Sequence, residues 1–286
     1  MDDAEEIAQE ARLRLHARTS TPENRDAYLT KIAVNLSIDR LRRLKQERLS
    51  YKGPWLPETI PPQWLANAEG APHELAEMAE SLSIGFMLML ENLAPKDRVI
   101  FALRTGFDHS HQEIAELLDL TEANVRQRFH RARQSMSAPQ SAFDTANTGA
   151  LARSAENKEL LQQLLLAVAE DDIQALMRLL TEDVITYTDG GGVISAAIIP
   201  IEGAERVATV ALHLAKRATA TENAGVHAIA IAGNPSIVIT DGAGIGSVIQ
   251  IDTTATVSGA HRIRRIYVLR NPQKMGAIQG WLDQQT

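Results

Sequence analysis

The chain has 286 residues, enough for two or three compact units, and its 44% hydrophobic and 23% charged residues are ordinary for a globular protein. It contains no cysteine, which excludes disulfide bonds and thiolate metal sites and favours a cytoplasmic location. There is no apolar run of about 18 residues, and the acidic N-terminus lacks the apolar segment of a signal peptide, so no membrane partner is expected.

The formal net charge of −7 argues against a nucleic-acid partner, but the basic residues are concentrated in two places. Between Lys31 and Lys52 there are seven Lys or Arg against two acids, and between Thr121 and Arg133 there are four Arg against one acid. Two local basic patches suit a protein that contacts DNA at two places. A pair of solvated helix faces would give the same pattern, so charge alone leaves both interpretations open.

The first part of the chain, 2–50, is predicted to be helical, with helices over 4–17 and 26–49. In the second helix Leu29, Ile32, Ala33 and Leu36 recur at helical spacing and are expected to form a buried stripe. Residues 51–72 hold five of the eleven prolines and little periodicity, which predicts an extended linker.

Residues 73–137 are predicted to be helical again, with Pro95 opening one helix and Gly106 closing it. A short apolar-faced helix near 114–118 is followed by a turn at Asp119 and a second helix that Thr121 caps. A glycine would reach the left-handed conformation of such a turn more cheaply than Asp119 does. The arrangement predicts a helix-turn-helix.

The second of these helices has one apolar and one basic face. Val125, Phe129, Ala132 and Met136 are expected to point inward, and the residues expected to point outward are Asn124, Arg126, Gln127, Arg128, His130, Arg131 and Arg133. Arginine and glutamine can read guanine and adenine edges in a major groove, and the other arginines suit phosphates. An ordinary helical hairpin with a basic surface is the alternative.

A second linker, rich in small polar residues, is predicted over 138–149. Beyond it the pattern changes to two helices, over 154–169 and 173–180, and then to β-rich runs. The expected strands are 184–188, 193–199, 226–231, 237–240, 247–256 and 262–269, interrupted by a helix near 203–217. We expect an α+β domain over 150–280, with its helices on one strongly bent antiparallel sheet.

Several segments resemble the sigma-70 family of transcription factors, in its extracytoplasmic-function class. Residues 113–115, 118–121 and 124–133 resemble region four, a helix-turn-helix that reads the minus-thirty-five promoter element, and residues 33–43 resemble the region-two helix that melts and reads the minus-ten element. The resemblance implies that core RNA polymerase and promoter DNA are the partners. It places DNA contacts at Asn35, Asp39, Arg42 and Arg43 as well as in the helix-turn-helix.

Residues 3–11 resemble the region-two segment that grips the clamp of RNA polymerase, which implies that Ile7, Gln9, Glu10 and Leu13 lie on or beside the polymerase-binding surface. The family normally has a further helix before this motif. Region two, over 2–50, is therefore expected to be incomplete at its N-terminal end, and region four is expected over 73–137.

Three further segments resemble one subgroup of the class, in which a SnoaL-like domain is fused at the C-terminus. They are Trp55-Leu56-Pro57-Glu58, Asp189-Gly190-Gly191-Gly192 and Asn271-Pro272-Gln273-Lys274-Met275. Val193 and Thr59 depart from the subgroup pattern, which has lysine and proline there. In the subgroup the fused domain resembles a built-in regulator, so these segments are expected to dock on one another, with Trp55 as an apolar anchor. A Trp55 that merely anchors the linker on its own helical domain is the alternative.

SnoaL-like cones also occur in isomerases and cyclases, so an enzyme fused to a DNA-binding module is a second hypothesis. Its candidate acid–base residues are Asp189, His213, His227 and His261, but none of them forms an evident pair. A helix-turn-helix regulator that acts without polymerase is a third hypothesis. We expect no enzymatic activity, no cofactor and no metal site, and leave open a small-molecule ligand in the C-terminal domain.

Overall fold

The computed structural model describes residues 2–17, 22, 24–59, 84–137, 150–219, 223–231, 234–242, 244–256 and 259–283. These form two compact units, each considered by itself. The helical unit comprises Met1–Ser50, Pro72–Leu75 and Met89–Asp144, and the second unit comprises Tyr51–Ala71, Ala76–Leu88 and Thr145–Thr286. The predicted linker 138–149 and most of the predicted linker 51–72 lie outside the described residues.

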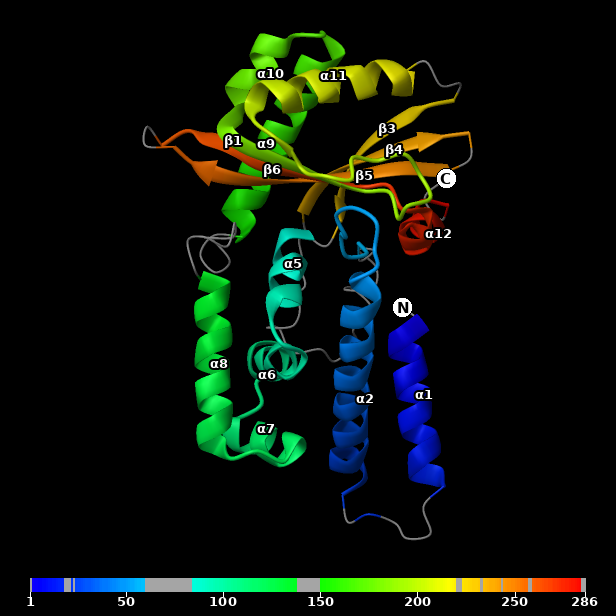
Figure 1. The fold of residues 1–286 in the computed structure, drawn as a ribbon, viewed down its shortest axis with the longest axis vertical. Coiled ribbons are helices and arrows are strands. Elements are labelled where there is room, and N and C mark those ends of the chain that lie inside the picture. The colour runs from blue at the N-terminus through cyan, green and yellow to red at the C-terminus, as the bar shows by residue number, and fades with distance from the viewer. Residues whose placement is uncertain are drawn as a thin grey trace. The chain divides into compact units, whose positions relative to one another are not determined.

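The helices of the first unit follow the predicted order (Figure 1). They are α1 (Asp2–His16), α2 (Arg25–Arg48), the end of α5 (Ile84–Asn92), α6 (Pro95–Gly106), α7 (His111–Leu118) and α8 (Glu122–Ser137). Pro95 opens α6 and Gly106 closes it, as predicted, because proline fits the first helical turn, where no backbone N–H is needed. Asn24 caps α2 by accepting a hydrogen bond from the Ala27 N–H.

The core of the helical unit joins α2 to α6, α7 and α8. Val34 and Ile38, at 8% and 3% exposure, pack with Ile100, Ile114 and Val125, which are fully buried. The expected stripe of Leu29, Ile32, Ala33 and Leu36 is only half-buried, and the prediction of its burial was wrong. Helix α2 contacts α1 as well as α6 and α7, so its apolar contacts spread over two sides and the most buried positions differ from a single stripe.

The second unit is an α+β domain built on one six-stranded sheet. Its elements are α9 (Ala150–Ala169), α10 (Ile173–Leu179), β1 (Leu180–Asp189), β2 (Ile201–Glu202), α11 (Ala204–Thr219), β3 (Gly225–Ile231), β4 (Asn234–Asp241), β5 (Gly244–Ala255), β6 (His261–Leu269), the short helix η1 (Pro272–Lys274) and α12 (Gly276–Leu282). The strand order is β2-β1-β6-β5-β4-β3. The sheet is mixed rather than antiparallel, because β1 and β6 run parallel.

One predicted strand is absent from the described sheet. Residues 193–199 form a loop, and the sheet instead gains the two-residue strand β2. Gly191 and Gly192 have positive φ values, and the N–H groups of Val193 and Ile194 both donate to the Gly190 carbonyl. These turn bonds fold the chain back on itself at the point where a ladder would have to begin.

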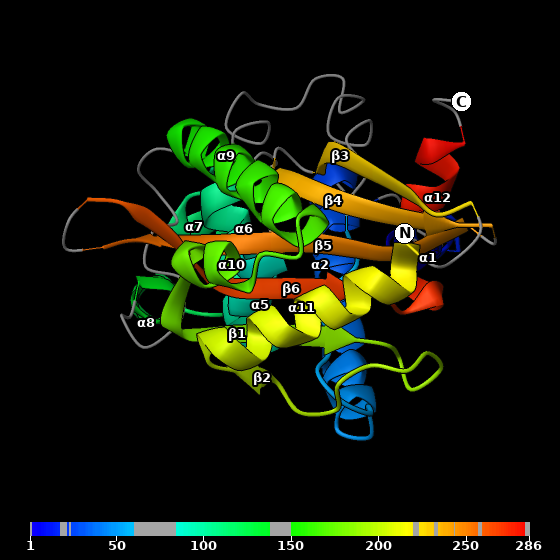
Figure 2. The same cartoon turned by 90° about the horizontal axis from the view of Figure 1, so that it is seen from above.

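Helices α9, α10 and α11 cover one face of the sheet (Figure 2). An apolar core lies beneath them and includes Leu161, Leu176, Val184, Ala208 and Ile263. Since side chains alternate along a strand, the neighbouring residues of β1, β5 and β6 point to the opposite face. That second face carries Asp189, Gln250 and Tyr267, all buried. Within the described ranges, no helix combines the length and apolar character needed to cross a membrane.

Candidate functional site

Helices α7 and α8 form the predicted helix-turn-helix. Ser110 and Glu113 make a capping box at the start of α7, and Asp119 ends it in the left-handed conformation, with φ 52° and ψ 50°. The Asn124 N–H donates to Thr121 Oγ1 over 3.3 Å, so Thr121 caps α8 as predicted. The strained turn at Asp119 sets the angle at which α8 leaves α7, and this angle determines which α8 side chains face solvent.

The apolar face of α8 is buried as predicted. Val125, Ala132 and Met136 are 0%, 2% and 5% exposed, and the ring of Phe129 lies 6.1 Å from that of Phe101. The opposite face is exposed and presents Asn124, Arg126, Gln127, His130, Arg131 and Arg133. This row of polar and basic side chains has the composition that major-groove readout requires.

Arg128 is the exception on this helix, and its predicted outward direction was wrong. Its side chain is 28% exposed and forms a 2.7 Å ion pair with Asp97 in the first turn of α6. Its Nε also donates to Asn124 Oδ1 over 2.8 Å. Asp97 attracts the guanidinium inward, so Arg128 ties α8 to α6.

We therefore expect different outcomes from arginines that look alike in the sequence. Replacing Arg126 and Arg131 together by alanine should weaken promoter binding by about 10- to 100-fold without changing stability, because both side chains are exposed. Arg128→Ala should in addition lower the free energy of unfolding by about 1 kcal/mol, since its ion pair is partly buried. Fluorescence anisotropy on a promoter duplex and urea unfolding measure the two effects, and unchanged promoter binding by the double variant would contradict the assignment.

The residues predicted to contact DNA on α2 are Asn35, Asp39, Arg42 and Arg43, and all four are exposed. Asp39 and Arg42 form a 2.8 Å ion pair one helical turn apart. On α1, Gln9 is exposed and Leu13 is 56% exposed, whereas Ile7 and Glu10 are half-buried. An exposed leucine beside polar residues on a short helix gives a surface that a protein partner can cover.

The ion cluster at Glu91 is a feature of the helical unit that the sequence analysis missed. Arg98 makes two hydrogen bonds to the Glu91 carboxylate, of 2.6 and 2.7 Å, and Arg48 pairs with the same carboxylate. The three side chains are only 16–21% exposed. Burial lowers the pKa of both Arg48 and Arg98 to about 10. One carboxylate thus holds α2, α5 and α6 together.

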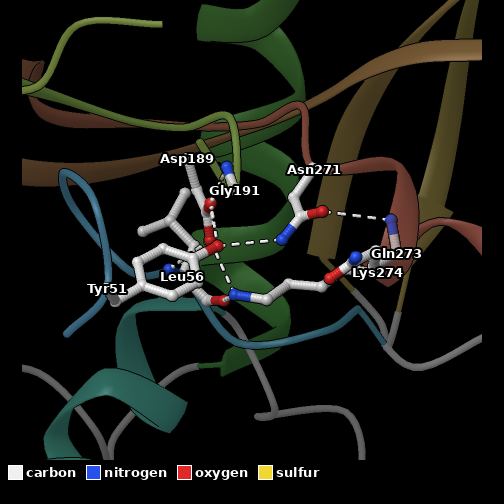
Figure 3. A network of polar contacts seen from close by, with 7 residues as sticks. All are labelled: Tyr51, Leu56, Asp189, Gly191, Asn271, Gln273 and Lys274. Atoms are coloured by element: carbon white, nitrogen blue, oxygen red, sulfur yellow. Dashed lines mark hydrogen bonds and ion pairs between the residues drawn. The ribbon is translucent and has the colours of Figure 1, made fainter. Parts of the chain in front are cut away.

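The second unit contains a buried carboxylate that binds the segment following α2 (Figure 3). Asp189, the last residue of β1, is fully buried. Its Oδ1 accepts from the Tyr51 hydroxyl over 2.5 Å and from the Gly191 N–H over 2.9 Å. Its Oδ2 accepts from the Leu56 N–H over 2.8 Å and from Lys274 Nζ over 2.7 Å. Both oxygens are therefore used by donors, two of which come from residues 51–59.

Lys274 also binds residues 51–59. Its Nζ donates to the Leu56 carbonyl over 2.6 Å and lies 4.3 Å from the centre of the Trp55 ring. A lysine that is 9% exposed requires such partners, and the ion pair with Asp189, the carbonyl and the aromatic face supply them. Leu56 is thus bound through its N–H and its carbonyl, and its side chain is 1% exposed.

Asn271 completes the network. Its Nδ2 donates to the Tyr51 hydroxyl over 2.8 Å, and its Oδ1 accepts from the Gln273 N–H, which shapes the turn before Lys274. Burial and the neighbouring Asp189 raise the pKa of Tyr51, so the phenol stays protonated and donates to the carboxylate. At Gly191 an added Cβ would lie 2.5 Å from Asn271, and φ is +65°, so only glycine fits there.

The structure brings together most of the residues predicted for interdomain docking. Trp55 and Leu56 lie in the network with Asp189, Gly191, Asn271 and Lys274. Pro57 is buried and Glu58 is exposed. Gly190 packs tightly against the loop that follows it, where a Cβ would meet the Ile194 carbonyl oxygen at 2.3 Å, and Gly192 approaches Lys52. Tyr51 was missed, although its position just before the proline-rich stretch marks it as the first aromatic residue of that segment.

The candidate acid–base residues do not form an active site. Asp189 is fully occupied by its four donors, and His213 and His227 are exposed. Nε2 of His227 lies 3.2 Å from the Thr240 hydroxyl rather than from an acid. In the part of the chain that the structure describes, no group of three or more His, Asp or Glu is placed to hold a metal ion.

Comparison with known proteins follows this division of the chain. Residues 1–47 match the family model described as Sigma-70 region 2, and residues 83–136 match Sigma-70, region 4. The chain is 32% identical over 217 residues to the ECF RNA polymerase sigma factor SigJ of Mycobacterium tuberculosis, a match covering 75% of this chain and 66% of SigJ. It is 30% identical over 137 residues to the ECF RNA polymerase sigma factor SigW of Bacillus subtilis, covering 47% and 73%.

The crystal structure of the M. tuberculosis extracytoplasmic-function sigma factor SigJ superposes with a TM-score of 0.66 and 25% identity, over 96% of this chain and 90% of that one. The helical unit, with its helix-turn-helix, thus defines a sigma-70-type transcription initiation factor. The chain belongs to the extracytoplasmic-function (ECF) sigma factors of that family, and its second unit is an α+β domain built on a six-stranded mixed sheet. Proteins of this family are not enzymes; they bind core RNA polymerase and promoter DNA.

Proposed function

We propose that this sigma factor directs core RNA polymerase to promoters from the cytoplasm, and that its C-terminal domain regulates the activity by holding residues 51–59. The observation that carries the proposal is Asp189, a fully buried carboxylate with two of its four donors in that segment. A buried carboxylate is costly unless it is fully paired, and here the pairing is complete only when the segment is bound.

The position of residues 51–59 in the chain explains how their binding to the C-terminal domain regulates promoter recognition. Residues 51–59 follow directly after α2, the region-two helix, and the region-four match begins at residue 83. Binding one stretch of this connection restricts the arrangements available to the two DNA-reading regions. A ligand or partner that favours either the held or the released state would shift promoter recognition accordingly, and a difference of about 1–3 kcal/mol is a useful regulatory range.

Most of the residues proposed to contact the two partners are exposed. Exposed Asn124, Arg126, Gln127, His130 and Arg131 on α8, with Asn35, Asp39, Arg42 and Arg43 on α2, are proposed to contact promoter DNA. The proposed polymerase-binding surface on α1 comprises Ile7, Gln9, Glu10 and Leu13. Arg128 acts mainly by fixing α8 on α6, and its DNA contact is secondary.

Among the described residues, one cleft is a candidate location for a small-molecule ligand of the C-terminal domain. A cleft of about 500 Å³ lies between β1, β2, β6 and the start of α11. Its lining includes the acids Glu182, Asp183 and Glu202 and the arginines Arg206, Arg264 and Arg265. Equal numbers of both signs give no preference for a ligand charge, so the regulatory proposal rests on the Asp189 network alone.

The proposal is tested by replacing Trp55, which stacks on Lys274, by alanine. This change should alter transcription by reconstituted holoenzyme at least threefold without unfolding the chain, because it loosens the segment and leaves the sheet intact. The matched control is Trp281→Ala, which removes another partly buried tryptophan of the same unit, on α12. Equal transcription by wild type and the Trp55 variant, with both variants folded, would contradict the regulatory role.

A further inference from the structure

The first helix of region four begins against the sheet of the C-terminal domain. Helix α5 starts at Ile84, and the first N–H groups of any α-helix lack partners within the helix. The Ile84 N–H donates to Oε1 of Gln250 on β5 over 3.0 Å, in a buried hydrogen bond that spans 166 residues of sequence. The sheet therefore supplies a cap for this helix.

Gln250 is held in one orientation. Its Nε2 donates to the Ser236 hydroxyl over 2.9 Å, and that hydroxyl donates to the Asn234 carbonyl over 3.0 Å. Gln250 and Ser236 stand directly opposite each other on β5 and β4 and are 3% and 1% exposed. With the amide nitrogen bound to Ser236, the amide oxygen is left to accept from the backbone, so the cap is preorganised.

The surroundings of this hydrogen bond exclude water. Ile84 is fully buried and Phe86 is 9% exposed. Val238 and Val248, also fully buried, lie two residues from Ser236 and Gln250 on their strands and so share the same face of the sheet. An N–H group that loses its acceptor in such an apolar environment has no water to replace it, so the Gln250 contact decides whether α5 can stay docked.

Residues 84–88 of α5 belong to the C-terminal unit, whereas its last residues belong to the helical unit. We infer that Gln250 is a second, separate attachment site of the C-terminal domain, dedicated to the start of region four. Asp189 binds the N–H of Leu56 and Gln250 binds the N–H of Ile84, so the domain holds both ends of the stretch that connects region two to region four. Both sites recognise backbone groups, and the second is electrically neutral.

The two sites differ in chemistry, which allows them to be separated. The first contains the buried Asp189–Lys274 ion pair, and the second contains only amide and hydroxyl groups. The inference extends the proposed regulation to region four, but the attachment itself does not depend on that proposal. Hydrogen–deuterium exchange of the full chain reads each site directly, through the amides of residues 84–88 and of residues 51–59.

Gln250→Leu keeps the shape of the side chain and removes the acceptor. We expect the exchange rate of the α5 first-turn amides to rise about 10- to 100-fold, with residues 51–59 unchanged. Asp189→Asn should instead raise the exchange rate of the residue 51–59 amides and leave that of the α5 first-turn amides unchanged. Gln163→Leu, at an exposed glutamine of α9 that bonds Glu159, is the matched control and should leave both segments as in the wild type.

Unchanged exchange at residues 84–88 in a folded Gln250→Leu protein would overturn the inference. If that variant fails to fold, Ser236→Ala decides instead, because it removes only the hydroxyl that orients Gln250. It should raise exchange in the first turn of α5 at least threefold, and wild-type rates there would equally overturn the inference. Altered exchange without any change in transcription would support the attachment and contradict only the regulatory proposal.

Discussion

Asp189→Asn is expected to release residues 51–59 and to lower the free energy of unfolding of the C-terminal unit by about 3–5 kcal/mol, the cost of breaking a buried ion pair. The substitution preserves the shape of the side chain but removes its charge. Lys274, at 9% exposure, then loses its anionic partner, while the Leu56 carbonyl and the rings of Tyr51 and Trp55 stay beside its ammonium group. The NH₂ group of the new amide is itself a donor. It replaces a carboxylate oxygen that accepts from two donors in the wild type, so those donors lose their acceptor.

Urea unfolding monitored by tryptophan fluorescence measures this change, and exchange of the residue 51–59 amides locates it. Asp183→Asn is the matched control, because Asp183 is 69% exposed and its nearest ion-pair distance to Arg264 is 3.7 Å. It should alter stability by less than about 0.5 kcal/mol. A loss of less than about 1 kcal/mol for Asp189→Asn would show that the network contributes little to docking.

Glu91→Gln is the second change for which we expect a large effect, of about 3–5 kcal/mol on the stability of the helical unit. Two arginines share this one carboxylate, and neither is more than 21% exposed. Without the negative charge, two guanidinium groups face each other in a half-buried site. Their mutual repulsion lowers the stability of the folded helical unit. Glu122→Gln is the control, because Glu122 is 45% exposed and pairs with exposed Arg126.

The pH dependence of this effect has a definite sign. Burial lowers the pKa of Arg48 and Arg98 to about 10 in the folded state, well below the ordinary value of an arginine in the unfolded chain. Between these values the unfolded chain binds more protons than the folded chain, so stability rises as the pH increases through this window. The cost of burying the two charged arginines is therefore fully present at neutral pH. The loss in free energy of unfolding that Glu91→Gln causes, relative to wild type, should shrink above pH 10. Thermal unfolding as a function of pH tests this, and a deficit that grows above pH 10 would contradict it.

The helix-turn-helix could be predicted in detail from the sequence because its determinants are local. Thr121 caps α8, Asp119 adopts the left-handed turn, and Val125 and Met136 are buried, all as the spacing of residues indicates. The inward position of Arg128 could not be predicted in the same way. It depends on Asp97, which is 31 residues away and meets Arg128 only after α6 and α8 have packed.

The contact between residues 51–59 and the C-terminal domain was expected only through resemblance to a subgroup of the family. Two of the four donors to Asp189, Leu56 and Tyr51, lie 133 and 138 residues earlier in the chain, and no periodicity relates them to it. Gln250 and Glu91 gave no sequence signal at all, because an isolated Gln or Glu is usually an exposed surface residue. Their roles follow from burial and from long-range partners, which only the fold defines.

The most direct test of the account is to lock the held segment covalently, which a chain without cysteine permits. A Cβ at Gly192 would lie 3.5 Å from Cβ of Lys52, within the range for a disulfide. In the Lys52→Cys, Gly192→Cys double variant, promoter-dependent transcription with core polymerase should differ between the oxidised and reduced forms by at least about fivefold. The single Gly192→Cys variant should not respond to oxidation. Equal transcription by the locked and unlocked double variant would contradict the claim that the C-terminal domain regulates this sigma factor by holding residues 51–59.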